Sequence, residues 1–170
     1  MNQYCLKCGH LLEQKIIERY ERDICPVCGW IYYIQLKVTA GMRVVQDSKL
    51  LLVQRAIEPW KGCWYLPAGY VEYDERPVQA AEREAREETG LEIKADNLEG
   101  VFFYDDDPRG NGLLILYSGR PIGGKIKINS EAEAIRFFSP FEIYSLKLAG
   151  GSHNIAIHDW LIKASDAGVQ

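Results

Sequence analysis

The sequence predicts an α/β protein in which a mixed sheet is sandwiched between helices, preceded by a small separate N-terminal module. Short aliphatic and aromatic runs alternate with turn-forming residues on both sides of one long segment of strong helix formers, Pro77–Thr89. Two similar cysteine pairs stand within the first thirty or so residues, before most of these runs. The 170 residues are 47% hydrophobic, which is enough to bury one full core.

The N-terminal module carries the motif CxxCG twice, at residues 5–9 and 25–29, with sixteen residues between Cys8 and Cys25. The glycine after each second cysteine permits the tight turn that directs two thiolates at one ion, and the spacing is typical of a four-cysteine zinc site. A redox pair and a set of disulfides are alternatives; the duplication weakens the first, and the lack of a signal peptide weakens the second. We therefore expect domain 1–34 to hold one structural Zn²⁺ through Cys5, Cys8, Cys25 and Cys28.

A larger domain is expected over residues 35–170. Segment Pro77–Thr89 has no internal glycine and is followed by Gly90, a typical helix C-terminal cap, so it predicts a helix. Aliphatic and aromatic runs before and after this helix predict the strands of the sheet. These runs lie at 30–45, 49–54, 63–66, 101–104, 113–117 and 134–138.

The C-terminal part predicts two further helices. Ser139 and Glu142 form a capping box around Pro140, so a short helix begins there. A final helix is predicted from an apolar stripe at Ala156, Ile157, Trp160, Leu161 and Ala164. We interpret His153 and His158 as ordinary residues of this helix, and Cys63 as a small packed residue.

The most specific pattern lies between residues 69 and 91. Seven identities recur at fixed spacing, and at average residue usage their coincidence has odds on the order of 10⁻⁸. The seven are Gly69, Glu75, Arg83, Glu84, Glu87, Glu88 and Gly90.

Three of these carboxylates share one face of the expected helix, because Glu84, Glu87 and Glu88 stand at i, i+3 and i+4. Like charges at this spacing repel one another unless a cation neutralises them, and hard oxygen ligands suit Mg²⁺ or Mn²⁺. Arg83 and Glu87 are spaced to form an i, i+4 ion pair. The alternative is a solvated acidic helix, which would scatter its carboxylates and would not need a glycine at each end.

This segment resembles the signature sequence of the Nudix hydrolases at every fixed position. The resemblance implies an α/β/α sandwich that hydrolyses the phosphoanhydride bond of a nucleoside diphosphate linked to another group, with divalent cations. It implies that Glu87 and Glu88 are the principal metal ligands and that Glu84 is a further ligand or a general base. The carbonyl of Ala68 is implied as another metal ligand.

Other roles also follow from the resemblance. Arg83 and Glu75 are expected to orient the glutamates, and a further catalytic carboxylate is expected on a loop beyond the signature. Glu131 and Glu133 are the candidates for that carboxylate, and Glu131 aligns better.

Two segments bear on the substrate. Residues 55–72 resemble the corresponding region of zinc-ribbon Nudix enzymes that hydrolyse ADP-ribose and FAD, and the DPRG sequence at 107–110 resembles a segment of ADP-ribose pyrophosphatases. We expect ADP-ribose, cleaved to AMP and ribose 5-phosphate, or FAD as substrate, with Arg109 gripping a phosphate or ribose. Aromatic residues near the signature could stack on a base or flavin. They are Trp60, Trp64, Tyr70 and Tyr73.

Other functions stay open. A nucleoside triphosphate, NADH or NAD-capped RNA pyrophosphatase is the main alternative, although the element SQPWPFP, typical of NADH pyrophosphatases, is missing after the signature. A second alternative is a non-catalytic sensor of ADP-ribose, but such proteins often lose signature glutamates and this chain has them all.

Charge and hydropathy restrict partners and location. The net charge of −4, without a basic stripe, argues against broad binding to nucleic acid or to acidic membranes. The resemblance implies a small-molecule nucleotide as the partner. No apolar run reaches the length of a membrane span and the N-terminus lacks a secretory segment, so a cytoplasmic protein without membrane contact is expected. The resemblance also allows a homodimer.

Overall fold

The computed structural model describes residues 3–166, and the chain divides into two compact units, the first ending at Gln35 and the second beginning at Leu36. The first unit is a three-stranded antiparallel sheet built from β1 (Glu13–Ile17), β2 (Tyr20–Ile24) and β3 (Ile31–Tyr32). The two CxxCG loops precede β1 and follow β2. Gly9 and Gly29 have φ values of 75° and 71°, which is the left-handed conformation expected at those turns.

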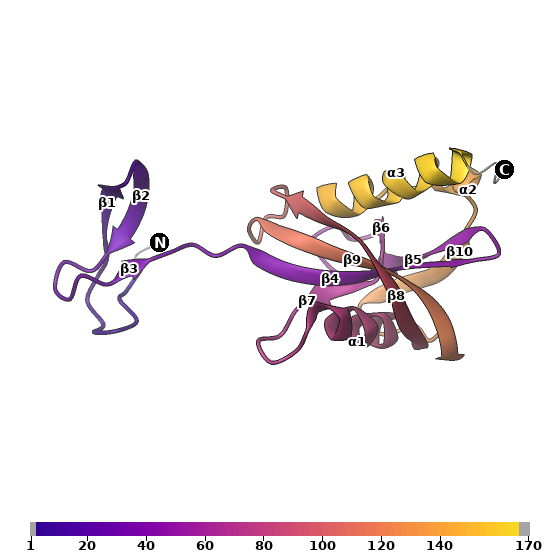
Figure 1. Ribbon diagram of the computed structural model, residues 1–170, viewed down its shortest axis with the longest axis horizontal. Helices are drawn as coiled ribbons and strands as arrows, with labels where there is room; N and C mark the ends of the chain where they lie inside the picture. The colour runs from indigo at the N-terminus through magenta and orange to yellow at the C-terminus, as the bar shows by residue number, and fades with distance from the viewer. Residues whose placement is uncertain (1–2, 167–170) are drawn as a thin grey trace. The chain divides into compact units, whose positions relative to one another are not determined.

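The second unit contains a seven-stranded mixed sheet, as the sequence predicts (Figure 1). Its main strands follow the order β10-β5-β4-β9-β8, while β6 pairs with β5 and β7 pairs with β4. Only β4 and β9 are parallel among the described pairs; the others are antiparallel. The strands are β4 (Lys37–Gln46), β5 (Lys49–Arg55), β6 (Trp64–Tyr65), β7 (Ala68–Tyr70), β8 (Leu91–Tyr104), β9 (Gly112–Gly124) and β10 (Ala132–Phe138).

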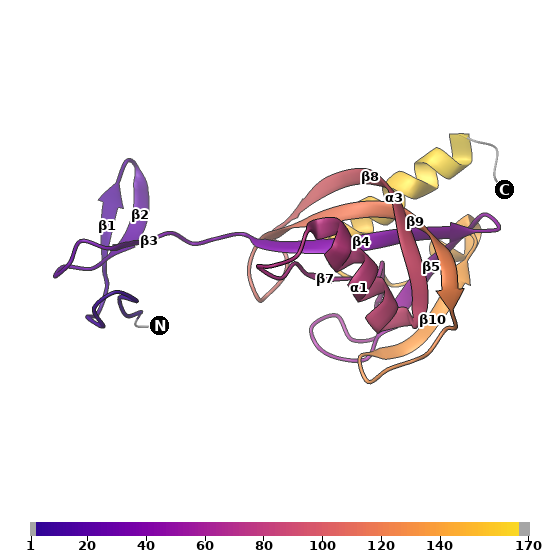
Figure 2. The same ribbon diagram turned by 60° about the horizontal axis from the view of Figure 1, so that its bottom comes forward.

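Helices cover both faces of this sheet. Figure 1 shows α1 (Pro77–Thr89) on one side and α3 (Gly151–Asp166) on the other, and Figure 2 brings α1 toward the viewer. The short helix α2 (Pro140–Ile143) begins at the capping box of Ser139 and Glu142, as predicted. No helix within residues 3–166 combines the length and apolar character needed to cross a membrane.

Each face has its own apolar core. The core under α1 includes Met42, Val53 and the three alanines of the helix that are fully buried, Ala80, Ala81 and Ala85. The core under α3 includes the predicted stripe of that helix and residues of the facing strands, among them Leu50, Leu52, Leu116 and Phe138. The small side chains let α1 lie close to the sheet.

The end of α1 is sharply defined. Gly90 has a φ of 75°, and a Cβ atom there would lie 2.5 Å from the carbonyl oxygen of Lys125, so glycine is required both by conformation and by space. Strand β8 starts at the next residue, ten positions before the strand predicted at 101–104. Leu91 and Ile93 are buried while Glu92 and Lys94 are exposed, an alternation of period two that marks the beginning of β8.

Candidate active site

The four cysteines of the first unit come together as predicted. Their Sγ atoms all lie within 4.8 Å of one another, and the shortest separations are 3.4 Å from Cys8 to Cys25 and from Cys8 to Cys28. Cys5 and Cys28 are 3.6 Å apart. Zn–S bonds of about 2.3 Å in a tetrahedron place the sulfurs about 3.8 Å apart, so this cluster fits one zinc ion.

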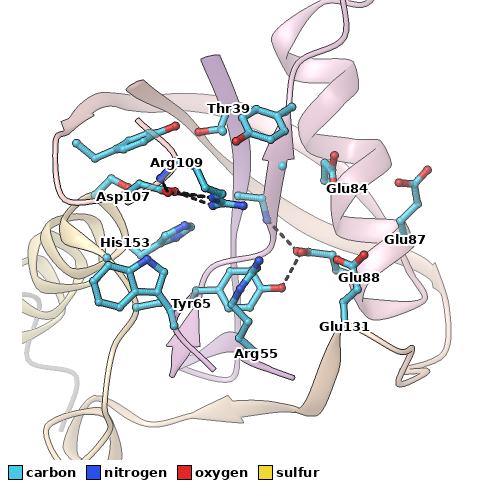
Figure 3. Close-up of a pocket in the computed structure, with 18 of the residues that line it drawn as sticks. Thr39, Arg55, Tyr65, Glu84, Glu87, Glu88, Asp107, Arg109, Glu131 and His153 are labelled. Atoms are coloured by element: carbon cyan, nitrogen blue, oxygen red, sulfur yellow. Dashed lines mark hydrogen bonds and ion pairs between the residues drawn. The ribbon is translucent and has the colours of Figure 1, made fainter. Parts of the chain in front are cut away.

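The second unit has a pocket of about 450 Å³ that gathers most of the other predicted residues (Figure 3). One wall comes from α1 and β7, with Glu131 at the edge of β10. The facing wall comes from loop 105–111 and from the start of α3. Among the predicted site residues, those lining the pocket are Ala68, Tyr70, Glu84, Glu87, Glu88, Arg109 and Glu131.

The three glutamates of α1 form the acidic wall of this pocket, and they differ in burial. Glu88 is 7% exposed and the Glu84 side chain 16%, whereas the Glu87 side chain is 53% exposed. Burial raises the pKa of Glu84 above its usual value, although Arg83 opposes the effect. Glu84 and Glu88, one turn apart, therefore offer a site where a bound cation would relieve the cost of buried negative charge.

Glu88 is held by two donors. The Tyr65 hydroxyl donates to Oε1 over 2.7 Å, and the backbone N–H of Ala68 donates to Oε2 over 3.0 Å. Burial nevertheless raises the pKa of Glu88 to about 8, and the nearby charge of Glu84 adds to the increase. Carboxylate oxygens fixed in this way suit a hard divalent cation such as Mg²⁺ or Mn²⁺.

Arg83 connects the acidic side chains to one another. It binds both oxygens of Glu75, at 2.6 and 3.1 Å, and donates to Glu84 at 2.7 Å and to Glu87 at 3.2 Å. The Glu87 contact is the predicted i, i+4 pair. The second terminal nitrogen of Arg83 also donates to the carbonyl of Tyr70, and this bond links β7 to α1. Arg83 therefore contacts Glu75, Glu84 and Glu87 at once.

Gly69 allows β7 to pass directly over the acidic wall. A Cβ atom at this position would lie 2.1 Å from Cδ of Glu84, so any side chain would collide with that carboxylate. The neighbouring Ala68 lines the pocket beside Glu88. The requirement for glycine at the start of the signature thus comes from close approach, not from backbone conformation.

Two guanidinium groups also line the pocket, that of Arg109 on the facing wall and that of Arg55 at the end of β5. Arg109 forms a bidentate pair with Asp107, with contacts of 2.6 to 3.2 Å, which raises the pKa of Arg109 and lowers that of Asp107. Arg55 lies over the ring of Tyr65 at 5.7 Å and donates through Nε to the carbonyl of Pro59. Figure 3 shows both guanidinium groups directed toward the middle of the pocket.

The structure corrects the expectation for Trp64. This residue packs in the core under α3, with its ring edge-on to Phe138 at 4.6 Å, and it is not part of the pocket. Adjacent residues of a strand point to opposite faces, so β6 sends Trp64 to one core and Tyr65 to the pocket. Tyr73 is 98% exposed, also outside the pocket lining, whereas Trp60 and Tyr70 do line it.

His153 is also placed differently from expectation. It is a half-buried pocket residue whose ring packs edge-on to Tyr65 at 5.6 Å, not an ordinary helix residue. His158 remains exposed on α3, as interpreted. Nothing in the sequence pattern distinguishes the two histidines. Only the tertiary structure brings the start of α3, and with it His153, to the pocket. Tyr65, Arg55 and His153 are therefore site residues that the sequence patterns miss.

Two family models match the chain: that of the NUDIX domain over residues 35–161, and that of the Nudix N-terminal zinc ribbon over residues 3–34. The chain belongs to the Nudix hydrolases. An ADP-ribose pyrophosphatase of Methanocaldococcus jannaschii is 35% identical over 90% of this chain and 86% of its own length. This Nudix hydrolase therefore resembles that protein in both units.

Solved structures agree with this assignment. A NUDIX hydrolase from Nitrosomonas europaea superposes with a TM-score of 0.81 at 28% identity, covering 96% of this chain and 93% of the other. A bifunctional NMN adenylyltransferase/ADP ribose pyrophosphatase from Francisella tularensis, complexed with AMP and a manganese ion, has a TM-score of 0.65 at 27% identity. That match covers 77% of this Nudix hydrolase and 42% of the other chain.

Proposed function

We propose that this Nudix hydrolase cleaves the phosphoanhydride bond of ADP-ribose to give AMP and ribose 5-phosphate, with FAD as a close competitor, using Mg²⁺ or Mn²⁺. The observation that carries the proposal is the charge pattern of one pocket, in which buried carboxylates of α1 face the guanidinium groups of Arg55 and Arg109. Carboxylates suit a divalent metal, and guanidinium groups suit the oxygens of a diphosphate.

Each part of the reaction has a residue in the pocket. The resemblance gives Glu87 and Glu88 as the principal metal ligands and Glu84 as a further ligand or base. Because Glu87 is more exposed than Glu84, we propose instead that Glu84 and Glu88 would hold the metal, with the carbonyl of Ala68, and that Glu87 would serve as an outer ligand. A bound divalent cation supplies Lewis-acid polarisation of the phosphate and a more acidic water. Glu131, at the edge of the same pocket, would accept the proton of the attacking water.

The arginines would act on the substrate. Arg109 is held by Asp107 in a fixed orientation, so little conformational entropy is lost when its guanidinium binds a phosphate or ribose. Its loop is fixed in turn because Lys37 of β4 donates to the Arg109 carbonyl. Such contacts are made in the ground state and in the transition state alike, so they contribute mainly to binding.

The choice of ADP-ribose is supported by the relatives. The protein of M. jannaschii that matches both units is an ADP-ribose pyrophosphatase, and the bifunctional F. tularensis enzyme is complexed with AMP, a product of the proposed reaction. Its manganese ion supports Mn²⁺ as one usable cation. In the first unit, we propose that Zn²⁺ has a structural role, because four cysteines complete its shell.

Steady-state kinetics on a panel of substrates tests the proposal. ADP-ribose, FAD, NADH and nucleoside triphosphates would each be assayed with Mg²⁺ and with Mn²⁺, and the products identified. We expect ADP-ribose to have the highest or second-highest kcat/KM and to yield AMP. Activity confined to nucleoside triphosphates would overturn the substrate while leaving the Nudix chemistry intact.

A further inference from the structure

The end of the pocket remote from the acidic wall has no role in the mechanism above. Four residues define this far end: Trp60, Asp106, Gly150 and His153. They come from the loop after β5, from loop 105–111, and from the residue before α3 and the first turn of that helix. A diphosphate lying between the metal ligands and the arginines would direct one of its two attached groups toward this far end.

His153 is the residue of the far end that most needs a partner. Its Nδ1 atom is buried and has no hydrogen bond to any residue within the described part of the chain. Burial lowers the pKa of His153 to about 4, with a further contribution from Arg55, so the imidazole is neutral at neutral pH. A neutral imidazole presents one donor and one acceptor, and a buried polar atom without a partner is costly unless a ligand or water satisfies it.

Trp60 provides a flat surface at the same end. It has a φ of 70°, which is unusual and strained for a bulky residue. The loop imposes this conformation through hydrogen bonds from the N–H of Cys63 to Trp60 and from the N–H of Gly62 to Arg55. The indole nitrogen would lie 3.8 Å from a Cβ at Gly150, so the ring and the glycine are neighbours.

Asp106 gives the far end a negative charge. One oxygen accepts the N–H of Gly151, the first residue of α3, at 2.6 Å, and this bond fixes the carboxylate beside Gly150. A carboxylate in this place repels a terminal phosphate and attracts hydroxyl or amino donors. The far end thus combines an aromatic face, a neutral imidazole and a carboxylate, which together suit an uncharged ring that carries hydrogen-bond donors.

We propose that the far end binds an uncharged, donor-bearing ring of the substrate, and that His153 is a specificity-determining residue that hydrogen-bonds this ring. The inference rests on the proposed function for the position of the diphosphate. Two parts of ADP-ribose have the required chemistry, the adenosine with its amino and hydroxyl groups, and the terminal ribose with its hydroxyls.

The two products of the proposed reaction serve as unreactive probes. Binding of AMP, ribose 5-phosphate and inorganic pyrophosphate, each with Mg²⁺, would be measured by isothermal titration calorimetry for the intact chain and for His153→Phe. We expect His153→Phe to weaken either AMP or ribose 5-phosphate about tenfold and to leave the other two probes within about twofold. The affected probe identifies the ring as adenosine or terminal ribose.

Two matched variants complete the experiment. His158→Phe makes the same change on the exposed side of α3 and should leave all three affinities as in the parent. His153→Gln keeps a donor and an acceptor and should restore most of the lost affinity, which loss of packing alone would not explain. If His153→Phe does not fold, Trp60→Leu replaces it and should weaken the same single probe.

Three results would overturn the inference. Unchanged binding of both AMP and ribose 5-phosphate by a folded His153→Phe would exclude the hydrogen bond. Equal weakening of all three probes would assign His153 to pocket structure instead, and so would a His153→Gln variant no better than His153→Phe. Hydrolysis of ADP-ribose by the same preparations reports on the proposed function separately, because the titrations require no turnover.

Discussion

The hydroxyl of Tyr65 donates a 2.7 Å hydrogen bond to Oε1 of Glu88, so a residue of β6 fixes the most buried carboxylate of α1. The other oxygen of Glu88 accepts the N–H of Ala68 in β7. Two strands therefore position this glutamate independently of any metal. A ligand fixed in advance loses little freedom when a cation binds, which favours tight and geometrically defined coordination.

Tyr65→Phe should weaken metal binding and stability together. The ring still packs, but Oε1 of Glu88 loses its donor inside the protein, which costs about 1–3 kcal/mol. We expect the thermal midpoint of unfolding to fall by several degrees and the Mg²⁺ concentration for half-maximal activity to rise. Calorimetry and metal titrations measure the two effects. Tyr144→Phe removes an exposed hydroxyl and serves as the control; an equal effect there would refute the role of the buried hydrogen bond.

Substitutions along the acidic wall should be graded by burial. Glu84→Gln and Glu88→Gln should each lower kcat by several orders of magnitude, because each would remove a charge from the proposed metal site in the pocket. Glu87→Gln should have a smaller effect, since its side chain is half exposed. Turnover assays over a range of Mn²⁺ concentrations measure the grading.

The control for these variants lies on the same helix. Glu82 accepts hydrogen bonds from the N–H of Ala95 and from Lys94, away from the pocket. Glu82→Gln should therefore keep turnover near that of the parent protein and lower stability slightly. Comparable loss of turnover in Glu82→Gln would show that the acidic wall is not the metal site.

Arg109→Ala should raise KM for ADP-ribose more than it lowers kcat. In the proposed function the guanidinium would contact the substrate in both the ground state and the transition state, so its loss would weaken binding throughout the reaction. Steady-state kinetics separates the two parameters. Arg120→Ala breaks a similar exposed pair, with Asp96, far along the β8–β9 hairpin and should change neither. A fall in kcat at constant KM would place Arg109 in the chemical step.

The zinc site should affect folding of the first unit and leave the chemistry intact. Protein purified without a chelator should contain one zinc ion per chain by elemental analysis, and Cys25→Ser should lose it. We expect this variant to lose ordered structure in residues 3–35, measured by NMR, while turnover per folded molecule stays near that of the parent. Loss of turnover in a variant whose second unit is folded would indicate a catalytic zinc.

His153 should make stability depend on pH in mildly acidic solution. Its pKa in the folded protein, about 4, lies below the usual 6.5 of the unfolded chain, so the unfolded state binds the proton first. The free energy of unfolding should therefore decrease as pH falls from about 6.5 to 4, by on the order of 2 kcal/mol. Urea unfolding at several pH values measures this. His153→Phe should remove this component, and an unchanged pH profile in that variant would contradict the assignment.

The sequence predicted the parts of the molecule that depend on local spacing. Glu84, Glu87 and Glu88 line one pocket because the period of a helix places them together, and the cysteines converge because each CxxCG forms its own turn. The far end could not be predicted, since its residues come from three separate segments. The prediction that Trp64 lines the pocket was wrong. Adjacent residues of a strand point to opposite faces, so only one of Trp64 and Tyr65 can face the pocket, and the sequence does not show which face of β6 that is.

The two sides of the pocket differ in how well they tolerate amino-acid substitutions. The acidic side depends on Gly69, where a side chain would displace the Glu84 carboxylate, and on Arg83, whose bonds join four residues. The remote side draws its residues from three separate segments: the loop after β5, loop 105–111 and the start of α3. A library for new substrate preferences would therefore randomise Trp60, Arg109 and His153 and keep α1 constant. In such a library the signature would preserve the chemistry, while the varied positions would change which molecule the pocket accepts.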